Sequence, residues 1–154
     1  MNDEVIGAAL IQLSDIANCV SGDLHTLHLN VQGIEFDNLH KKVLKKYYEQ
    51  ASDDYDALSE SARMFYVPVP STNESSKRLE YQSVEGAYQT RIDVVSITEE
   101  LLVTLLEAYH KVFLLLNKKE DDYRCIGVTN FLQTRIEYWA KEKCFFNHNR
   151  REAI

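Results

Sequence analysis

The chain has 154 residues, which is enough for one domain with a sizeable hydrophobic core. Its formal net charge is −7, which disfavours binding to nucleic acid unless basic residues cluster. They gather in only two short groups, interpreted as a solvated helix face and a solvated tail: Lys41, Lys42, Lys45 and Lys46, and then Arg150 and Arg151.

Two prolines and five glycines punctuate little of the sequence, which favours a few long helices over many short strands. Cys19, Cys125 and Cys144 form neither a CxxC pair nor a zinc spacing, so we expect buried thiols in a reducing compartment. Neither a signal peptide nor an apolar run long enough for a membrane span is visible. The sequence therefore predicts a cytoplasmic protein without membrane association.

Along residues 3–31, apolar residues recur at steps of three or four, which predicts one long amphipathic helix with a single buried stripe. The stripe consists of Ile6, Leu10, Leu13, Ala17, Val20, Leu24, Leu27 and Val31. We expect Asn30 and Gly33 to end this helix.

A second helix is predicted from residue 35 or 36 to about residue 66. Its buried stripe is predicted to contain Phe36, Leu39, Val43, Tyr47, Ala51, Leu58, Ala62 and Phe65. The stripe loses its register over residues 52–56, and one inserted residue carried as a π-bulge would explain the loss.

Pro68 and Pro70 end the second helix, and a polar stretch with a short helix around residues 76–81 follows. A third helix is predicted from residue 83 or 84 to about 118, and a fourth from about 122 to 146. Their expected core residues are Ala87, Ile92, Val95, Leu102, Leu106, Tyr109, Phe113 and Leu116, and then Ile126, Phe131, Ile136, Trp139 and Cys144. The pattern predicts a single all-α domain, residues 1–154: an up-down four-helix bundle with one long crossover between its second and third long helices.

His28 and His40 are candidate metal ligands, twelve residues apart on the two sides of Gly33. Asp56 and Glu60 follow at i,i+4 spacing, which places both carboxylates on one helix face. Histidine nitrogen with carboxylate oxygen suits iron(II), manganese or zinc. The alternatives are packed structural histidines and an acidic, solvated helix face.

These four residues cannot form one site within one chain. His40 and Asp56 are sixteen residues apart on the same predicted helix, which separates them by roughly 24 Å. They can meet only if a second chain packs antiparallel and presents its carboxylates to the histidines of the first. The metal hypothesis therefore predicts an oligomer.

Glu107 and His110 form a second candidate, because Glu-x-x-His is an inward-facing ligand motif of di-iron bundles. With Glu60 they would make a di-metal site inside one bundle. The fourth helix offers Glu137 and Glu142 but no histidine at the required spacing.

The stretch HLNVQGIEFDNLH resembles the hallmark of Dps mini-ferritins, H-W-N/x-V-x-G-x-x-F-x-x-L-H, and YDALSES resembles their V-D-T-I-A-E-R. The resemblance covers mainly residues 24–62. It implies a ferritin-like fold in a hollow dodecamer built from two-fold dimers. It also implies that His28 and His40 of one subunit, with Asp56 and Glu60 of its neighbour, bind iron(II). Peroxide or oxygen would oxidise the iron, which would be stored as ferric mineral and so protect against oxidative stress.

The sequence departs from this pattern at several positions. Leu29 stands for the family's tryptophan, Leu44 for an acid often found four residues after the second histidine, and Ser61 for an arginine. Asp56 arrives one residue late, so that an ungapped alignment puts Tyr55 and Ser59 at the ligand positions. These departures favour the alternative hypothesis, a catalytically inactive ferritin-like shell or interaction protein. The Lys-rich tail with which some members bind DNA is absent, so DNA binding is not expected.

Overall fold

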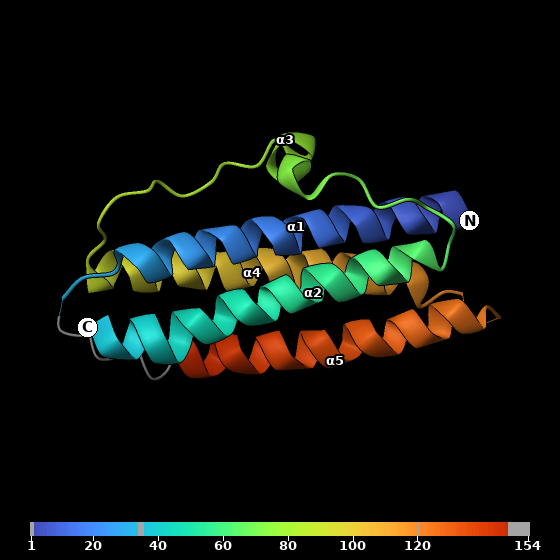
Figure 1. Ribbon diagram of the computed structural model, residues 1–154. Coiled ribbons are helices and arrows are strands. Elements are labelled where there is room, and N and C mark those ends of the chain that lie inside the picture. The colour runs from blue at the N-terminus through green and yellow to red at the C-terminus, as the bar shows by residue number, and fades with distance from the viewer. Residues whose placement is uncertain (1, 34–35, 120, 148–154) are drawn as a thin grey trace.

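Four long helices lie side by side in the computed structural model, which describes residues 2–33, 36–119 and 121–147 (Figure 1). They are α1 (Asp3–Asn30), α2 (Lys45–Arg63), α4 (Arg91–Leu116) and α5 (Tyr123–Phe146). A π-helix, η1 (Asn38–Leu44), leads directly into α2. Extended pairing in the described part of the chain is limited to an isolated bridge between Val31 and Gln89. The predicted all-α class is confirmed.

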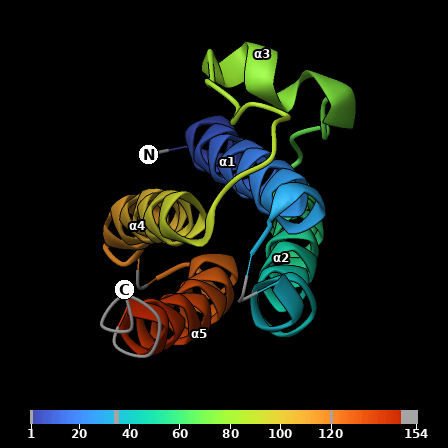
Figure 2. The same cartoon turned by 90° about the vertical axis from the view of Figure 1, so that its left-hand side faces the viewer.

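The long crossover sets the topology of the bundle. α1 and α2 form one antiparallel pair and α4 and α5 form another, as both views show (Figures 1 and 2). Between the pairs the chain runs back along the outside of α1 and carries η2 (Thr72–Glu74) and α3 (Ser75–Leu79). α4 therefore runs parallel to α2. The predicted single crossover and its short helix are confirmed.

Helix α1 follows its sequence pattern closely. Each of the eight apolar residues of its predicted stripe is at most 3% exposed. The Asn2 side chain caps the helix by accepting a hydrogen bond from the Val5 amide at 3.0 Å. The helix ends at Asn30, and Gly33 then adopts φ +103°, a conformation that favours glycine.

α1 is also the one helix among those described whose length and hydropathy would suit a bilayer, with a mean hydropathy of 1.4 over its most apolar window. Half of that window is buried inside the bundle. Its buried stripe forms part of one core together with residues of α2, α4 and α5. Core packing therefore accounts for its apolar character.

Helix α4 begins at Arg91, and the predicted start at residue 83 or 84 is wrong. Gln89 is held in extended form, because its amide donates to the Asn30 carbonyl and its carbonyl accepts from the Gln32 amide, both at 3.0 Å. Thr90 then caps the helix by accepting from the Asp93 amide. The polar stretch before Thr90 belongs to the crossover.

The π-helical turn lies at Asn38–Leu44, about a dozen residues before the predicted position, and α2 is regular through residues 52–56. The apparent gap in the stripe has a different cause. Asp54 occupies an inward-facing position, 2% exposed, and is paired with Arg135, a cation whose side chain is 15% exposed. In the sequence, this buried polar residue therefore resembles a break in the helical spacing of the apolar stripe. The alternative predicted start at Glu35, like Arg150 and Arg151, lies outside the described residues.

Several residues predicted in the core are exposed. They are Phe36, Ala87, Ile92, Ile126 and Cys144. Ala87 lies in the extended crossover and Ile92 in the first turn of α4, so both precede the part of that helix that packs into the core. Cys19 and Cys125 are buried as predicted.

Candidate metal centre

His28 and His40 come together where α1 ends and η1 begins. Their rings stack with centroids 3.7 Å apart and an angle of 11° between the planes. His28 Nδ1 lies 2.7 Å from the carbonyl oxygen of His40, and His40 Nδ1 lies 2.6 Å from the carbonyl oxygen of His28. Each ring is therefore fixed by the backbone of the other residue.

These reciprocal hydrogen bonds define which ring nitrogen carries the proton. A carbonyl oxygen can only accept, so Nδ1 of each histidine must donate. In the neutral form of each ring the proton is then on Nδ1, and Nε2 keeps its lone pair. Metal-binding histidines commonly have this arrangement, in which one ring nitrogen donates to a carbonyl and the other binds the ion. The pair is thus suited to bind a divalent cation through two Nε2 atoms.

Burial and charge favour the neutral form of His28. His28 is only 8% exposed, and this burial lowers its pKa below the ordinary value for histidine. The hydrogen bond to the His40 carbonyl raises the pKa of His28 and partly opposes the effect of burial, and the positive charge of Lys45 adds a small effect in the direction of burial. His28 is therefore unprotonated near neutral pH, as a metal ligand must be.

Aromatic neighbours extend the histidine stack, and the sequence analysis did not single them out. Phe36 stacks on His40 at a centroid distance of 4.7 Å. On the other side, Tyr48 meets His28 edge-on at 5.1 Å and stacks on His25 at 4.2 Å. The position of His25, three residues before His28 on the same helix, is the signal that could have identified it.

The π-helical turn changes which residue follows His40 on its face of the helix. The Lys45 amide donates to the His40 carbonyl, so the residue one turn on is Lys45 at i+5. Leu44, the i+4 residue, is fully buried in the core. Leu44 therefore does not face the histidines, and Lys45 is the residue one turn beyond His40.

Asp56 and Glu60 are both exposed on α2, and Asp56 comes sixteen residues, or about four helical turns, after His40. Ser59, which an ungapped alignment would make a ligand, is 7% exposed and buried in the bundle. The two carboxylates thus reach the surface, as the predicted site requires. The chain does not bring them to its own histidines, and no cluster of three or more histidine, cysteine or acidic side chains suited to a metal occurs within the described residues.

The centre of the bundle holds an ion pair in place of a metal cluster. Arg135 Nε lies 2.7 Å from Asp54 Oδ1, and Trp139 Nε1 donates to Asp54 Oδ2 at 2.7 Å. Burial raises the pKa of Asp54, and the hydrogen bond from Trp139 and the charge of Arg135 oppose that rise. The guanidinium therefore supplies the positive charge that this carboxylate needs.

The hypothesis of a di-metal site inside one bundle is contradicted by exposure. Glu107 and His110 lie on the outward side of α4, and Glu60 is exposed on α2. The three side chains therefore do not converge in the bundle interior.

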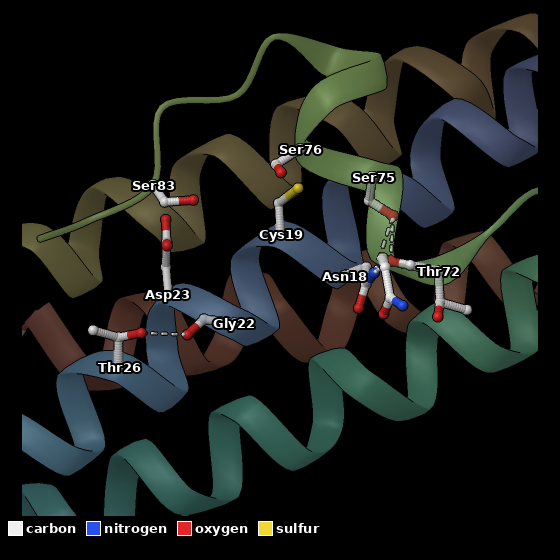
Figure 3. Close-up of a pocket in the computed structure, with 10 residues that line it drawn as sticks. Asn18, Cys19, Gly22, Asp23, Thr26, Thr72, Ser75, Ser76 and Ser83 are labelled. Atoms are coloured by element: carbon white, nitrogen blue, oxygen red, sulfur yellow. Dashed lines mark hydrogen bonds between the residues drawn. The ribbon is translucent and has the colours of Figure 1, made fainter. Parts of the chain in front are cut away.

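A polar cavity of about 260 Å³ lies between α1 and the crossover (Figure 3). Its Asp23 carboxylate accepts from the Tyr81 hydroxyl at 2.7 Å and from the Val84 amide at 3.1 Å. Burial raises the pKa of the Cys19 thiol to about 11, so it is protonated at neutral pH. Asn18 donates to Thr72 and Ser75. These groups hold the crossover against α1 and offer no free anionic ligand pair for a cation.

No protein-family model matches the sequence, and no curated protein matches it. Solved structures do. A Dps protein from Bacillus brevis superposes with a TM-score of 0.79 at 19% identity and covers 95% of each chain. A C-terminal deletion mutant of Mycobacterium smegmatis Dps gives 0.83 at 14% identity, over 96% of this chain and 98% of the other.

A Dps protein from Vibrio cholerae O1, described as a member of the ferritin-like diiron-carboxylate superfamily, gives 0.80 at 18% identity, over 95% of this chain and 89% of the other. The chain therefore has the ferritin-like fold. More closely, it is a divergent version of the fold that Dps mini-ferritins have. The resemblance read from HLNVQGIEFDNLH is confirmed at the level of the fold.

Proposed function

We propose that this protein is an iron-binding mini-ferritin that oxidises iron(II) at a site shared by two subunits and stores ferric iron in a hollow oligomer. His28 and His40 of one subunit would bind the iron. Asp56 and Glu60 of the neighbouring subunit would complete the ligand set. The observation that carries the proposal is the reciprocal bonding of the two stacked histidine rings, which engages both Nδ1 atoms and leaves a lone pair on the Nε2 atom of each ring.

The surroundings of the histidine pair support a subunit interface there. Leu29, next to His28 in sequence, is 63% exposed, and Phe36, which stacks on His40, is 40% exposed. Exposed apolar side chains beside a candidate site suit contact with another chain. A two-fold dimer would form two identical sites. By analogy with Dps proteins, we propose a dodecamer built from such two-fold dimers in the cytoplasm.

The π-helical turn supports Asp56 and Glu60 as the ligands, in preference to Tyr55 and Ser59. A π-turn accommodates one additional residue in a helix. This turn includes the step from His40 to Lys45, so the additional residue lies between His40 and the carboxylates. The late arrival of Asp56 in the sequence is thereby offset. The carboxylates are exposed, whereas Ser59 faces the bundle interior.

The chemistry follows from this ligand set. Each iron(II) would give up one electron and become iron(III), for which carboxylate oxygen is a favourable ligand. Two such ions would reduce one peroxide, with two protons, to two molecules of water, and four would reduce one molecule of oxygen, with four protons, to two of water. The neutral Nε2 atoms bind the incoming iron(II), and the Nδ1–H bonds to the carbonyls keep both rings oriented. Two carboxylates would balance the charge of one divalent ion.

The test follows iron oxidation by ferric absorbance in size-fractionated protein, first in air and then with peroxide. The protein should oxidise iron(II) faster than a protein-free control, and iron should co-elute with the assembly. His28→Ala and Asp56→Ala should each lower the initial rate by about tenfold or more. His110→Ala changes an exposed histidine on α4 and is the matched control.

Unchanged oxidation in both His28→Ala and Asp56→Ala, with assembly intact, would refute the proposal. Assembly of the unaltered protein with only background oxidation would instead support a catalytically inactive ferritin-like shell. That alternative rests on the lysine that stands beside the histidines.

A further inference from the structure

Lys45 lies beside the histidine pair because of the π-helical turn. Its amide and His28 Nδ1 both donate to the His40 carbonyl oxygen. Two donors on one oxygen lie within about 6 Å of each other. The Lys45 side chain therefore starts next to the His28 ring.

Three neighbouring residues of this turn are engaged elsewhere. Val43 and Leu44 are buried in the core, and the Lys41 ammonium lies 3.9 Å from an Asp37 carboxylate oxygen. The Lys45 ammonium lies 4.0 Å from Glu49, and both side chains are more than half exposed. A pair this exposed is weak, so Glu49 does not hold the Lys45 side chain firmly away from the histidines.

We propose that Lys45 limits the histidine site to a single divalent cation. This inference rests on the proposed function. The first ion takes the two Nε2 atoms and the partner's carboxylates. A second ion would have to bind close by on the Lys45 side. There the positive charge of the lysine repels the ion, and the position holds a lysine where a second ion would need a carboxylate ligand.

Cobalt(II) is a suitable probe because air does not readily oxidise it at such sites, so that binding is measured without turnover. We expect calorimetric titration of the assembled protein to give one cobalt(II) per histidine pair. Lys45→Glu should give two, because it replaces the repelling charge with a ligand. Lys45→Gln should strengthen binding of a second cobalt(II) by about tenfold, because it removes the repulsion alone.

Lys41→Glu is the matched control, since it makes the same charge change in the same turn, beside Asp37 and not beside His28. It should still bind one cobalt(II). Circular dichroism and size-exclusion chromatography would verify that each variant folds and assembles. If Lys45→Glu does not fold, Lys45→Gln alone tests whether Lys45 repels a second cobalt(II).

The outcomes separate this inference from the proposed function. Two cobalt(II) ions per pair in the unaltered protein would overturn the role of Lys45 and leave the proposed function standing. An unchanged single ion in both Lys45 variants would do the same. No cobalt(II) bound by the unaltered protein would overturn both.

Discussion

At the scale of single residues, His28 couples metal binding to the folded state. Its side chain is buried and neutral near pH 7, and its Nδ1–H donates a hydrogen bond to the carbonyl oxygen of His40. The same bond that orients the ring contributes to joining α1 to η1. Metal affinity and local stability should therefore both depend on the protonation state of this residue.

The pH dependence of stability should report His28 directly. Burial lowers its pKa in the folded state, so the unfolded chain binds this proton more readily and stability falls as the pH drops below about 6.5. His28→Gln should show a smaller fall in urea midpoint between pH 7.5 and 5.5 at fixed protein concentration. His110→Gln, altered at the surface, is the control, and an equal fall in His28→Gln and unaltered protein would contradict the argument.

Asp54 shows why a polar residue can interrupt a predicted apolar stripe. Its carboxylate is held by Arg135 and Trp139 in the bundle centre. Neither partner is close in sequence, since both lie on α5. Sequence periodicity alone could not separate this buried pair from a helix irregularity.

Removing the cation of that pair should be costly. Arg135→Met leaves the Asp54 carboxylate buried without its partner charge, which should lower the free energy of unfolding by about 3–5 kcal/mol. Asp54→Asn combined with Arg135→Met should recover most of the loss, because asparagine can still accept from Trp139. Urea denaturation measures both variants, and a double variant no more stable than Arg135→Met would contradict this explanation.

At the scale of elements, the π-helical turn connects the two halves of the candidate site. The sequence predicted such a turn from the disturbed stripe, but the structure has it at His40. The long helices, the crossover and the end of α1 at Asn30 could be predicted, since they depend on local periodicity and on residues that end helices. The start of α4 could not, because pairing of Gln89 with the end of α1 decides it.

Deleting Lys42 should convert the turn to an α-helix. The packed part of α2 would stay in place and His40 would turn by about 100° relative to it. We expect the stack on His28 to be lost and cobalt(II) affinity to fall at least tenfold, with helix content retained by circular dichroism. Lys42→Ala, which keeps the length of the turn, should bind cobalt(II) normally; equal binding by the deletion variant would show that the turn does not matter.

At the scale of the whole molecule, the histidines and the carboxylates lie at different levels of the bundle and can share a site only between chains. His28 and His40 meet, as their spacing across Gly33 suggested, whereas Asp56 and Glu60 remain at the surface. The sequence could predict the members of the proposed site. It could not predict Lys45, because the hydrogen-bond register of the turn determines its position.

Complementation between variants tests the shared site most directly. One variant would carry His28→Ala and His40→Ala, and the other Asp56→Ala and Glu60→Ala. Neither alone should bind cobalt(II) at the site. When they are co-expressed with different tags and purified as mixed assemblies, each mixed dimer contains one intact site.

Random mixing makes half of the dimers mixed, so the assemblies should bind about a quarter of the cobalt(II) that the unaltered protein binds. This recovery would establish that two chains build each site. Mixed assemblies that bind no more cobalt(II) than their parents would contradict the shared site, and with it the proposed function.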